Sequence, residues 1–357
     1  MTESMGIDRA GKVRAGEELD AEAVSRWLTL LGVPVEGAPE VTQFSGGASN
    51  WTYRLHYPQH DLILRRPPSG TKAKSAHDMG REYRVQKALK PFYPAVPAMV
   101  GLCEDDTLIG AQFYVMQRIA GIIPRRRLPQ GISLGAADTR RLCENMLDKL
   151  VELHGIDIAE AGLETLGKGA GYVQRQVTGW SDRYGKARTW NTPTFKLVRD
   201  WLAANIPDDA RTCLIHNDWR FDNLVLDPED LTSIIGVLDW EMATSGDPLM
   251  DLGSMLAYWV ESGDGYFMKM TQRQPTTLPG MMKRREVIDY YLQKSGLKVN
   301  NFAFYEVFGL FRLAVIAQQI YYRYYHRQTR NPAFKNIWVM VNYFDWRCWR
   351  IIRQSGQ

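Results

Sequence analysis

Two patterns of apolar and polar residues follow one another along the chain. In the first, residues 41–66 contain short alternating runs, VTQF, WTYRLHY and LILRR, which predict strands separated by turns. A helix capped by Asp20 is expected before them, and a second helix is expected to begin at Ser75. Strand-like runs at residues 99–103 and 112–119 complete a small, mostly antiparallel sheet with one embedded helix.

The remaining part of the chain follows a mostly helical pattern. Apolar residues recur at spacings of three and four, as in residues 136–154, where Leu142 and Leu150 share one face. A compact strand-rich island at residues 213–240 interrupts these helices. The expected helices are 136–154, 172–184, 195–205, 249–259, 283–294, 302–327 and 333–353.

These patterns predict an α+β protein with two lobes. We expect a flexible arm over residues 1–19, a small antiparallel-sheet lobe over 20–120, and a large, mostly helical lobe over 121–357. The four cysteines form no CxxC pair, so neither a zinc site nor a disulfide framework is expected. The N-terminal residues contain no apolar signal-peptide core, and no long uncharged apolar run predicts a membrane span. We therefore expect a cytoplasmic protein.

The strand-rich island carries the chemistry. Its sequence over residues 214–241, LIHNDWRFDNLVLDPEDLTSIIGVLDWE, places Asp218 and Asn223 in a loop between two apolar runs, and Asp239 after the next one. Two carboxylates and an amide at strand ends are what magnesium-assisted phosphoryl transfer needs. Magnesium takes hard oxygen ligands and retains several waters, so one carboxylate and one amide suit it beside phosphate oxygens. The other carboxylate stays free to accept the proton of an attacking hydroxyl.

This island, with the SGDPLMDLG segment that follows it, resembles the aminoglycoside phosphotransferase superfamily, whose members are kinase-like. The resemblance extends from about residue 20 to residue 354 and implies a protein-kinase-like bilobal fold. It also implies ATP-dependent phosphorylation of a small-molecule hydroxyl, with GTP left open as the donor. By the resemblance, Asp218 is the catalytic base, and Asn223 and Asp239 bind magnesium.

The N-terminal lobe contains matching nucleotide-binding features. Backbone N–H groups of a Gly-rich turn, SGGASN, can cradle phosphates, which makes candidates of Ser45, Gly46, Gly47 and Ser49. The resemblance implies that residues 112–119 form the hinge strand. It identifies Met116 as the gatekeeper and directs the backbone of Gln117 and Ile119 toward adenine.

Arg65 and Glu82 complete the nucleotide site that the resemblance implies. The superfamily carries a phosphate-contacting lysine at the position of Arg65, and Glu82 matches the acid that pairs with this cation. Arginine binds phosphate bidentately but is bulkier than lysine and not interchangeable with it. In one subgroup, the phosphotransferase domains that accompany acyl-CoA dehydrogenases, arginine at this position is usual. The motifs LRRPP, AHDMGREYRV and DWEMATSGDP are similar to that subgroup.

The subgroup resemblance implies a hydroxyacyl-CoA acceptor and possible partnership with a separate acyl-CoA dehydrogenase. The charge distribution points the same way. The formal net charge is only +4, but residues 241–357 carry 15 lysines and arginines against nine acidic residues, which leaves the first 240 residues at −2. We expect the acceptor site within residues 250–357, and an excess of cations there favours an anionic acceptor over a polycation. The cations concerned are Lys283, Arg284, Arg285, Arg312, Arg323, Arg327 and Arg330.

Two alternatives to an anion kinase follow from the sequence. The arginine at position 65 motivates a pseudokinase that binds a nucleotide or CoA ester without transfer, although the intact Asp218, Asn223 and Asp239 argue against it. An aminoglycoside kinase is disfavoured by the basic C-terminal part. The mixed aromatic and basic run IYYRYYHR is the only feature that favours nucleic acid, so no nucleic-acid partner is expected.

Overall fold

The computed structural model describes residues 8, 10–44, 50–68 and 78–356. The chain divides into two compact units. The first unit comprises the chain up to Pro124 together with residues 128–133 and 223–242, and the second comprises residues 125–127, 134–222 and 243–357. The four candidate phosphate-binding residues of the Gly-rich turn, Ser45, Gly46, Gly47 and Ser49, lie outside the described residues.

A five-stranded antiparallel sheet forms the first unit, with strand order β1-β2-β3-β5-β4. The strands are β1 (Glu40–Gln43), β2 (Trp51–His56), β3 (Asp61–Arg66), β4 (Met99–Cys103) and β5 (Phe113–Gln117). The predicted strands and the antiparallel pairing are confirmed. Successive side chains of a strand point to opposite faces, and β3 and β5 bury apolar residues on both faces.

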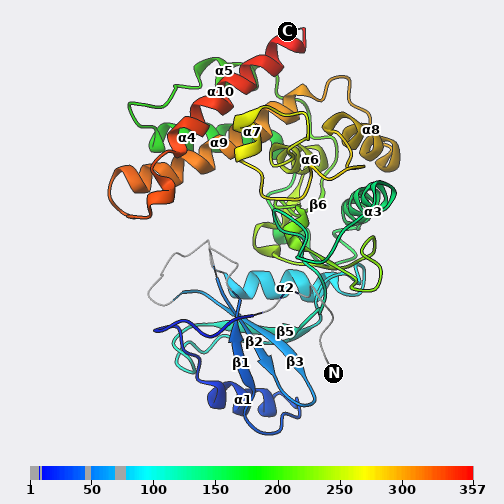
Figure 1. Ribbon diagram of the computed structural model, residues 1–357, viewed down its shortest axis with the longest axis vertical. Coiled ribbons are helices and arrows are strands. Elements are labelled where there is room, and N and C mark those ends of the chain that lie inside the picture. The colour runs from blue at the N-terminus through cyan, green and yellow to red at the C-terminus, as the bar shows by residue number, and fades with distance from the viewer. Residues whose placement is uncertain (1–7, 9, 45–49, 69–77, 357) are drawn as a thin grey trace. The chain divides into compact units, whose positions relative to one another are not determined.

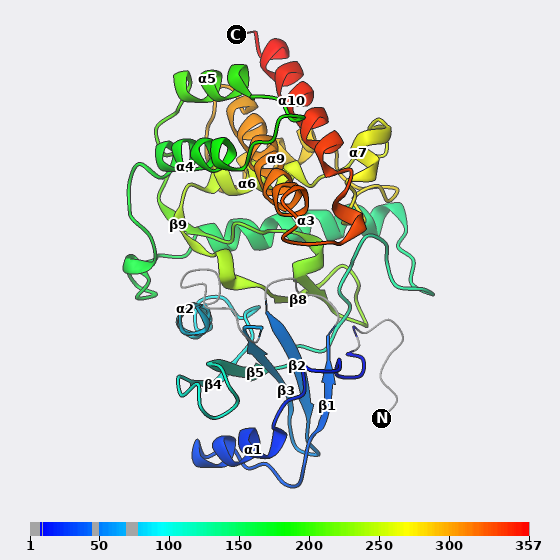
Figure 2. The same cartoon turned by 90° about the vertical axis from the view of Figure 1, so that its left-hand side faces the viewer.

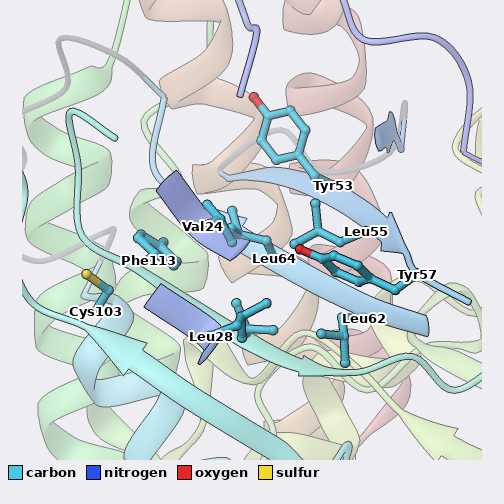
Figure 3. Packing of buried hydrophobic residues seen from close by; sticks show 10 residues of the cluster. Val24, Leu28, Tyr53, Leu55, Tyr57, Leu62, Leu64, Cys103 and Phe113 are labelled. Atoms are coloured by element: carbon cyan, nitrogen blue, oxygen red, sulfur yellow. The ribbon is translucent and has the colours of Figure 1, made fainter. Parts of the chain in front are cut away.

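Each face of this sheet packs against one helix. Helix α1 (Ala21–Leu30), capped by Asp20 as predicted, packs its Val24 and Leu28 into an apolar cluster with residues of β2, β3 and β5 (Figure 3). The opposite cluster joins Ile63 of β3 to Met79 of α2 (Met79–Leu89). Since successive side chains of a strand point to opposite faces, Arg65 lies on the same face as Ile63, toward α2.

Two segments join the first unit although the sequence predicted otherwise. Residues near the N-terminus, expected as a flexible arm, pair with the sheet through a bridge between Gly11 and Gln43. The hairpin of β7 (Leu224–Leu226) and β8 (Ile234–Val237), expected in the helical lobe, bridges Ile122 through Leu226. These pairings form between distant parts of the chain, which local periodicity does not reveal.

The second unit is mostly helical (Figures 1 and 2). It contains a two-stranded sheet of β6 (Cys213–Ile215) and β9 (Thr244–Gly246). Its α-helices are α3 (Ala136–His154), α4 (Tyr172–Ala187), α5 (Lys196–Ala204), α6 (Pro248–Ala257), α7 (Tyr266–Met270), α8 (Arg284–Ser295), α9 (Ala303–Tyr325) and α10 (Ile337–Gln354). Short 3₁₀ turns occur at Glu164–Leu166, Phe221–Asn223, Trp240–Met242 and Pro332–Phe334, of which Trp240–Met242 lies in the first unit and Phe221–Asn223 ends at the boundary between the units.

Helix α9 is the central helix of the second unit and packs against α4, α6 and α10. Among the described residues it alone is long and apolar enough to cross a membrane, and 67% of its most apolar window is buried within the molecule, as in the core helix of a folded domain. At the crossing with α6, a Cβ added at Gly253 would collide with the Tyr305 carbonyl, and one added at Gly309 would collide with the Gly253 carbonyl. The two backbones therefore approach closely, which fixes α6.

Candidate active site

Three residues predicted to contact the nucleotide or its metal lie together in the first unit. Arg65 of β3 donates from Nη1 to Glu82 Oε1 at 2.6 Å and from Nη2 to Asp239 Oδ1 at 3.1 Å. Glu82 lies on the buried face of α2, in the cluster to which the alternation of β3 directs Arg65. The predicted pairing of Arg65 with Glu82 is therefore present, and the same guanidinium also reaches one of the two predicted magnesium ligands.

Burial and charge act against each other in this cluster. Burial by itself would lower the pKa of Arg65, but Glu82, Tyr114 and Asp239 favour the charged guanidinium and raise that pKa well above its ordinary value. Burial raises the pKa of Glu82, and Arg65 opposes this rise. The arginine therefore stays positively charged, and its charge is available to a phosphate that reaches the site.

The β7–β8 hairpin brings the two predicted metal ligands into one unit. Asn223 precedes β7, and its carbonyl accepts a hydrogen bond from the Leu238 N–H at 2.8 Å, immediately before Asp239. Asp239 adopts a left-handed φ of 65°, which turns the chain sharply after β8. The neighbouring Glu241 accepts from Asn50 Nδ2 at 3.2 Å and so ties this turn to β2.

The donor set of this hairpin fits magnesium. It offers one carboxylate and one amide oxygen, which are hard ligands, and magnesium binds through few protein groups when phosphates and waters supply the others. Among the described residues, no group of three or more His, Cys, Asp or Glu side chains forms a metal cluster, as a zinc site would require. Asn223 and Asp239 are therefore suited to a magnesium ion that a nucleotide brings with it.

The predicted catalytic loop with Asp218 belongs to the second unit and is held by Asp251 of α6. The Oδ2 atom of Asp251 accepts the His216 N–H at 2.8 Å, and its Oδ1 atom accepts the Asn217 N–H at 2.9 Å. Asn217 has a φ of 65°, so the backbone turns directly before Asp218. One buried carboxylate thus fixes the two peptide groups that orient the predicted base.

A buried polar chain supports Asp251 in turn. His154, at the end of α3, contacts Asp251 Oδ2 through Nε2 at 3.1 Å and the Tyr291 hydroxyl through Nδ1 at 2.6 Å. Burial would raise the pKa of Asp251, but hydrogen bonds from His154 and from the loop backbone lower it below its ordinary value. The carboxylate therefore stays ionised. The sequence indicated Asp251 through SGDPLMDLG but gave no signal for His154 or Tyr291.

Arg220 is a site residue that the sequence reasoning missed. Its guanidinium lies between two carboxylates, with Nη2 3.2 Å from Asp218 Oδ2 and Nε 3.2 Å from Asp222 Oδ1. Burial raises the pKa of Asp222, and Arg220 opposes the rise. The sequence shows Arg220 two residues after Asp218, the predicted base. This short spacing was the signal that could have identified Arg220 as a partner of the base.

Arg312 has a different role from the one expected. The sequence grouped it with cations for an anionic acceptor, but it is buried in α9 and donates from Nη2 to the Asn217 carbonyl at 3.0 Å. Its guanidinium lies 5.4 Å from the centroid of the Trp180 ring. Arg312 therefore supports the predicted catalytic loop from the helix core, because the packing of α9 against its neighbouring helices turns this position inward.

The backbone N–H groups of the predicted hinge, at Gln117 and Ile119, differ in their hydrogen bonds. The Gln117 N–H donates to the Ala98 carbonyl at 2.8 Å, so this N–H is not left for an adenine. The Ile119 N–H makes no hydrogen bond to any described residue. Met116, the predicted gatekeeper, is buried between β3 and α2. The adenine contacts of Gln117 and Ile119 remain a prediction.

A family model described as the phosphotransferase enzyme family matches residues 40–287, a range that includes Arg65, Asp218 and Asp239. The chain belongs to this family. The resemblance seen in the sequence is thus confirmed, and so is the kinase-like α+β fold.

Among curated proteins, this phosphotransferase is 34% identical over 322 residues to acyl-CoA dehydrogenase family member 10 of Mus musculus. The match covers 89% of this chain and 30% of the mouse protein. Three such relatives are covered over 30% to 41% of their own length, so the chain spans about a third of each.

Among solved structures, a Ralstonia eutropha protein assigned to the aminoglycoside phosphotransferases is 27% identical, with a TM-score of 0.80. That match covers 95% of this chain and 100% of the other. The ternary complex of APH(2")-IIa with streptomycin and ATP is 15% identical, with a TM-score of 0.53 over 92% of this chain and 97% of that one. This second likeness concerns the fold alone.

Proposed function

We propose that this phosphotransferase is an ATP- and magnesium-dependent kinase that phosphorylates a hydroxyl group of a small anionic metabolite, such as a hydroxyacyl-CoA. The observation that carries the proposal is the cluster in which Arg65 bridges Glu82 and Asp239. A buried acid that anchors a cation, next to an acid at a strand end, is the arrangement that aligns a nucleotide with its metal.

Each of the proposed site residues has its own role in phosphoryl transfer. Asp218 orients the acceptor hydroxyl and takes its proton as the oxygen bonds to the γ-phosphorus, and ADP leaves with the electron pair of the broken bond. Arg65 contacts the phosphates, while Asn223 and Asp239 hold magnesium, which neutralises phosphate charge when it is bound. Arg220, which lies 3.2 Å from Asp218, holds that carboxylate in place through an ion pair.

Two observations support the choice of donor and acceptor. A structural neighbour binds ATP, which supports a nucleotide as the donor. Relatives carry the name acyl-CoA dehydrogenase family member, and the basic C-terminal part suits an anion, so a hydroxyacyl-CoA is the proposed acceptor and an acyl-CoA dehydrogenase a proposed partner. The four cysteines are free and buried, which agrees with the proposed cytoplasmic location.

The test is a transfer screen with γ-labelled ATP over hydroxyacyl-CoAs, amino alcohols, sugars and aminoglycosides. We expect label on a hydroxyacyl-CoA, and we expect Asp218→Asn to lower turnover by about a hundredfold or more while nucleotide binding is retained. The matched control is Asp182→Asn, an exposed acid on α4, which should leave turnover unchanged.

Transfer to an aminoglycoside in place of the CoA esters would contradict the anionic acceptor. Binding of nucleotide with no transfer to any acceptor would favour the pseudokinase, and unchanged turnover in Asp218→Asn would remove the assigned base.

A further inference from the structure

A pocket of about 580 Å³ opens in the second unit, apart from the residues assigned to catalysis. It lies between the segment that leads into α7, the start of α8 and the second half of α10. Helices α7 and α10 are neighbours in both views of the structure (Figures 1 and 2). The volume is that of a site for a small molecule.

Cations dominate the charge of this pocket. Three arginines and one acid, Asp264, line it. Arg284 binds Asp264 with two hydrogen bonds of 2.8 and 2.7 Å, and Arg347 lies 3.4 Å from the same carboxylate. Arg350 makes no ion pair with any described residue, and its guanidinium lies 5.0 Å from the centroid of the Trp346 ring. One arginine is thus fixed in the wall, and another remains available to an anion.

Aromatic rings form the rest of the wall. Phe267 and Tyr343 lie with ring centroids 5.6 Å apart, and Tyr343 and Trp346 lie 5.7 Å apart, both pairs tilted by about 33–34°. Trp346 is 47% exposed and Tyr266 is 73% exposed, although both are large apolar side chains. Exposed aromatic faces beside arginines suit a planar ring that carries phosphate, because the ring can stack while the phosphate meets the guanidinium.

The pocket is connected to the catalytic loop within the same unit. Phe221, three residues after the predicted base, packs against Trp259 with a centroid distance of 5.9 Å. The Trp259 carbonyl accepts from Arg284 Nη1 at 2.6 Å, and Arg284 lines the pocket. One buried residue, Trp259, therefore links the loop to the pocket wall.

We infer that this pocket binds a purine ring bearing phosphate. Two sources share that chemistry, the nucleotide end of a CoA ester and a free adenine nucleotide. The first source rests on the proposed function, since it makes the pocket the distal part of the acceptor site. The second would be a nucleotide site separate from the one in the first unit.

The test measures dissociation constants for CoA, ADP and pantetheine by isothermal titration calorimetry. The variants are Arg350→Ala and, as a matched control, Arg353→Ala. Arg353 lies one turn further along α10, is also exposed and also lies over a tryptophan, Trp349, at 4.7 Å, but it does not line the pocket. We expect Arg350→Ala to weaken binding of the occupying ligand about tenfold and Arg353→Ala to change it less than twofold. The dissociation constant of pantetheine, which lacks both the purine ring and the phosphate, should be the same in the variants and in the wild type.

The ligand that responds identifies the source. A response with CoA supports the acceptor end, and a response with ADP alone supports a free nucleotide. An ADP molecule in the nucleotide site of the first unit is not expected to respond to a variant on α10. Trp346→Ala provides a second variant. It should weaken binding of the same ligand, because the aromatic face on which the ring stacks is lost.

Three results would overturn the inference. These are no response with either nucleotide ligand, an equal response in Arg353→Ala, or binding to phosphatidylserine vesicles that only Arg350→Ala abolishes. Failure of the pocket assignment can be distinguished from failure of the proposed kinase activity. If transfer proceeds while Arg350→Ala leaves the dissociation constants of both CoA and ADP unchanged, the pocket assignment alone fails. If CoA binding depends on Arg350 but no acceptor is phosphorylated, the proposed kinase activity alone fails.

Discussion

At the scale of single residues, the geometry of Arg65 determines how the predicted nucleotide site is held together. Its two Nη atoms contact two different carboxylates, Glu82 and Asp239, at 2.6 and 3.1 Å. A planar guanidinium can span two acceptors in this way, whereas a lysine ammonium is a single compact charge on a flexible stem. The arginine therefore does more than replace the lysine that the resemblance implies, because it also links α2 to the turn after β8.

Arg65→Lys tests this difference. We expect the KM for ATP to rise by about tenfold with a smaller change in kcat, because the charge remains but the link to Asp239 is weakened. Arg65→Met should lower the free energy of unfolding by about 3 kcal/mol, since Glu82 would be left buried without a cation. Initial-rate kinetics and urea unfolding measure the two effects.

The control for this pair is Arg54→Lys, which alters a two-pronged contact with Asp61 on the same sheet. It should leave the KM for ATP unchanged. An equal rise of KM in both lysine variants would show that Arg65 has no special role in nucleotide alignment.

At the scale of elements, α6 holds the loop that carries Asp218, the proposed base. Asp251 lies in the first turn of α6, and the close crossing of Gly253 and Gly309 fixes that helix against α9. The catalytic loop is thus held by a helix in the core of the second unit.

Asp251→Asn should lower kcat about tenfold or more with little change in the KM for ATP. The amide has only one oxygen, so it can accept from only one of the two loop N–H groups that Asp251 now satisfies. Steady-state kinetics over both substrates measure this, with Asp289→Asn on the exposed face of α8 as the control. A selective rise in the KM for ATP, with kcat unchanged, would contradict a loop-positioning role.

The β2–β3 hairpin gives a pH-dependent prediction. Burial would raise the pKa of Asp61, but hydrogen bonds from Arg54 and Arg118 lower it below its ordinary value. A carboxyl with a lowered folded pKa contributes stability above its unfolded pKa, about 3.9, and loses that contribution as the pH falls through the folded value.

Asp61→Asn should therefore cost about 1–2 kcal/mol of unfolding free energy near neutral pH, and the difference from wild type should shrink below about pH 4. Urea unfolding of both proteins across this range measures the difference. Asp106→Asn, an exposed turn residue, should show no such trend. A difference that stays constant down to about pH 3 would mean that the charge of Asp61 is not its source.

At the scale of the whole molecule, the residues assigned to catalysis are divided between the two units. Arg65, Glu82, Asn223 and Asp239 belong to the first unit, and Asp218 belongs to the second. The chain passes from one unit to the other between Asp218 and Asn223, so the two halves of the proposed chemistry are only five residues apart in sequence.

A non-hydrolysable ATP analogue with magnesium should stabilise the protein. At about 100 times its dissociation constant, a ligand that binds only the folded state adds about 2.7 kcal/mol, which thermal unfolding detects. Removing magnesium with EDTA should abolish most of this gain, and Asp239→Asn should make the protein insensitive to the metal. Asp227→Asn, in the turn between β7 and β8, is the control on the same hairpin. A full gain without magnesium would contradict the assigned metal ligands.

Local patterns along the chain were enough to predict most elements and the candidate chemistry. The helix over residues 136–154 and the cap at Asp20 follow from spacing and capping, which act within a few turns. The loop residues Asp218, Asn223 and Asp239 were also visible, because their order and spacing lie within one short segment. Arg65 and Glu82 were predicted as a pair from the resemblance, and the strand alternation explains why they meet.

Long-range packing sets which segments pair across the chain and which cations face inward. The β7–β8 hairpin joins the first unit through Ile122, and Arg312 turns toward the catalytic loop from α9. Helix α7 is only five residues long and shows no clear period, so it and the pocket beside α10 were not predicted. Contacts between residues distant in sequence depend on packing and register, which hydrophobic periodicity does not encode.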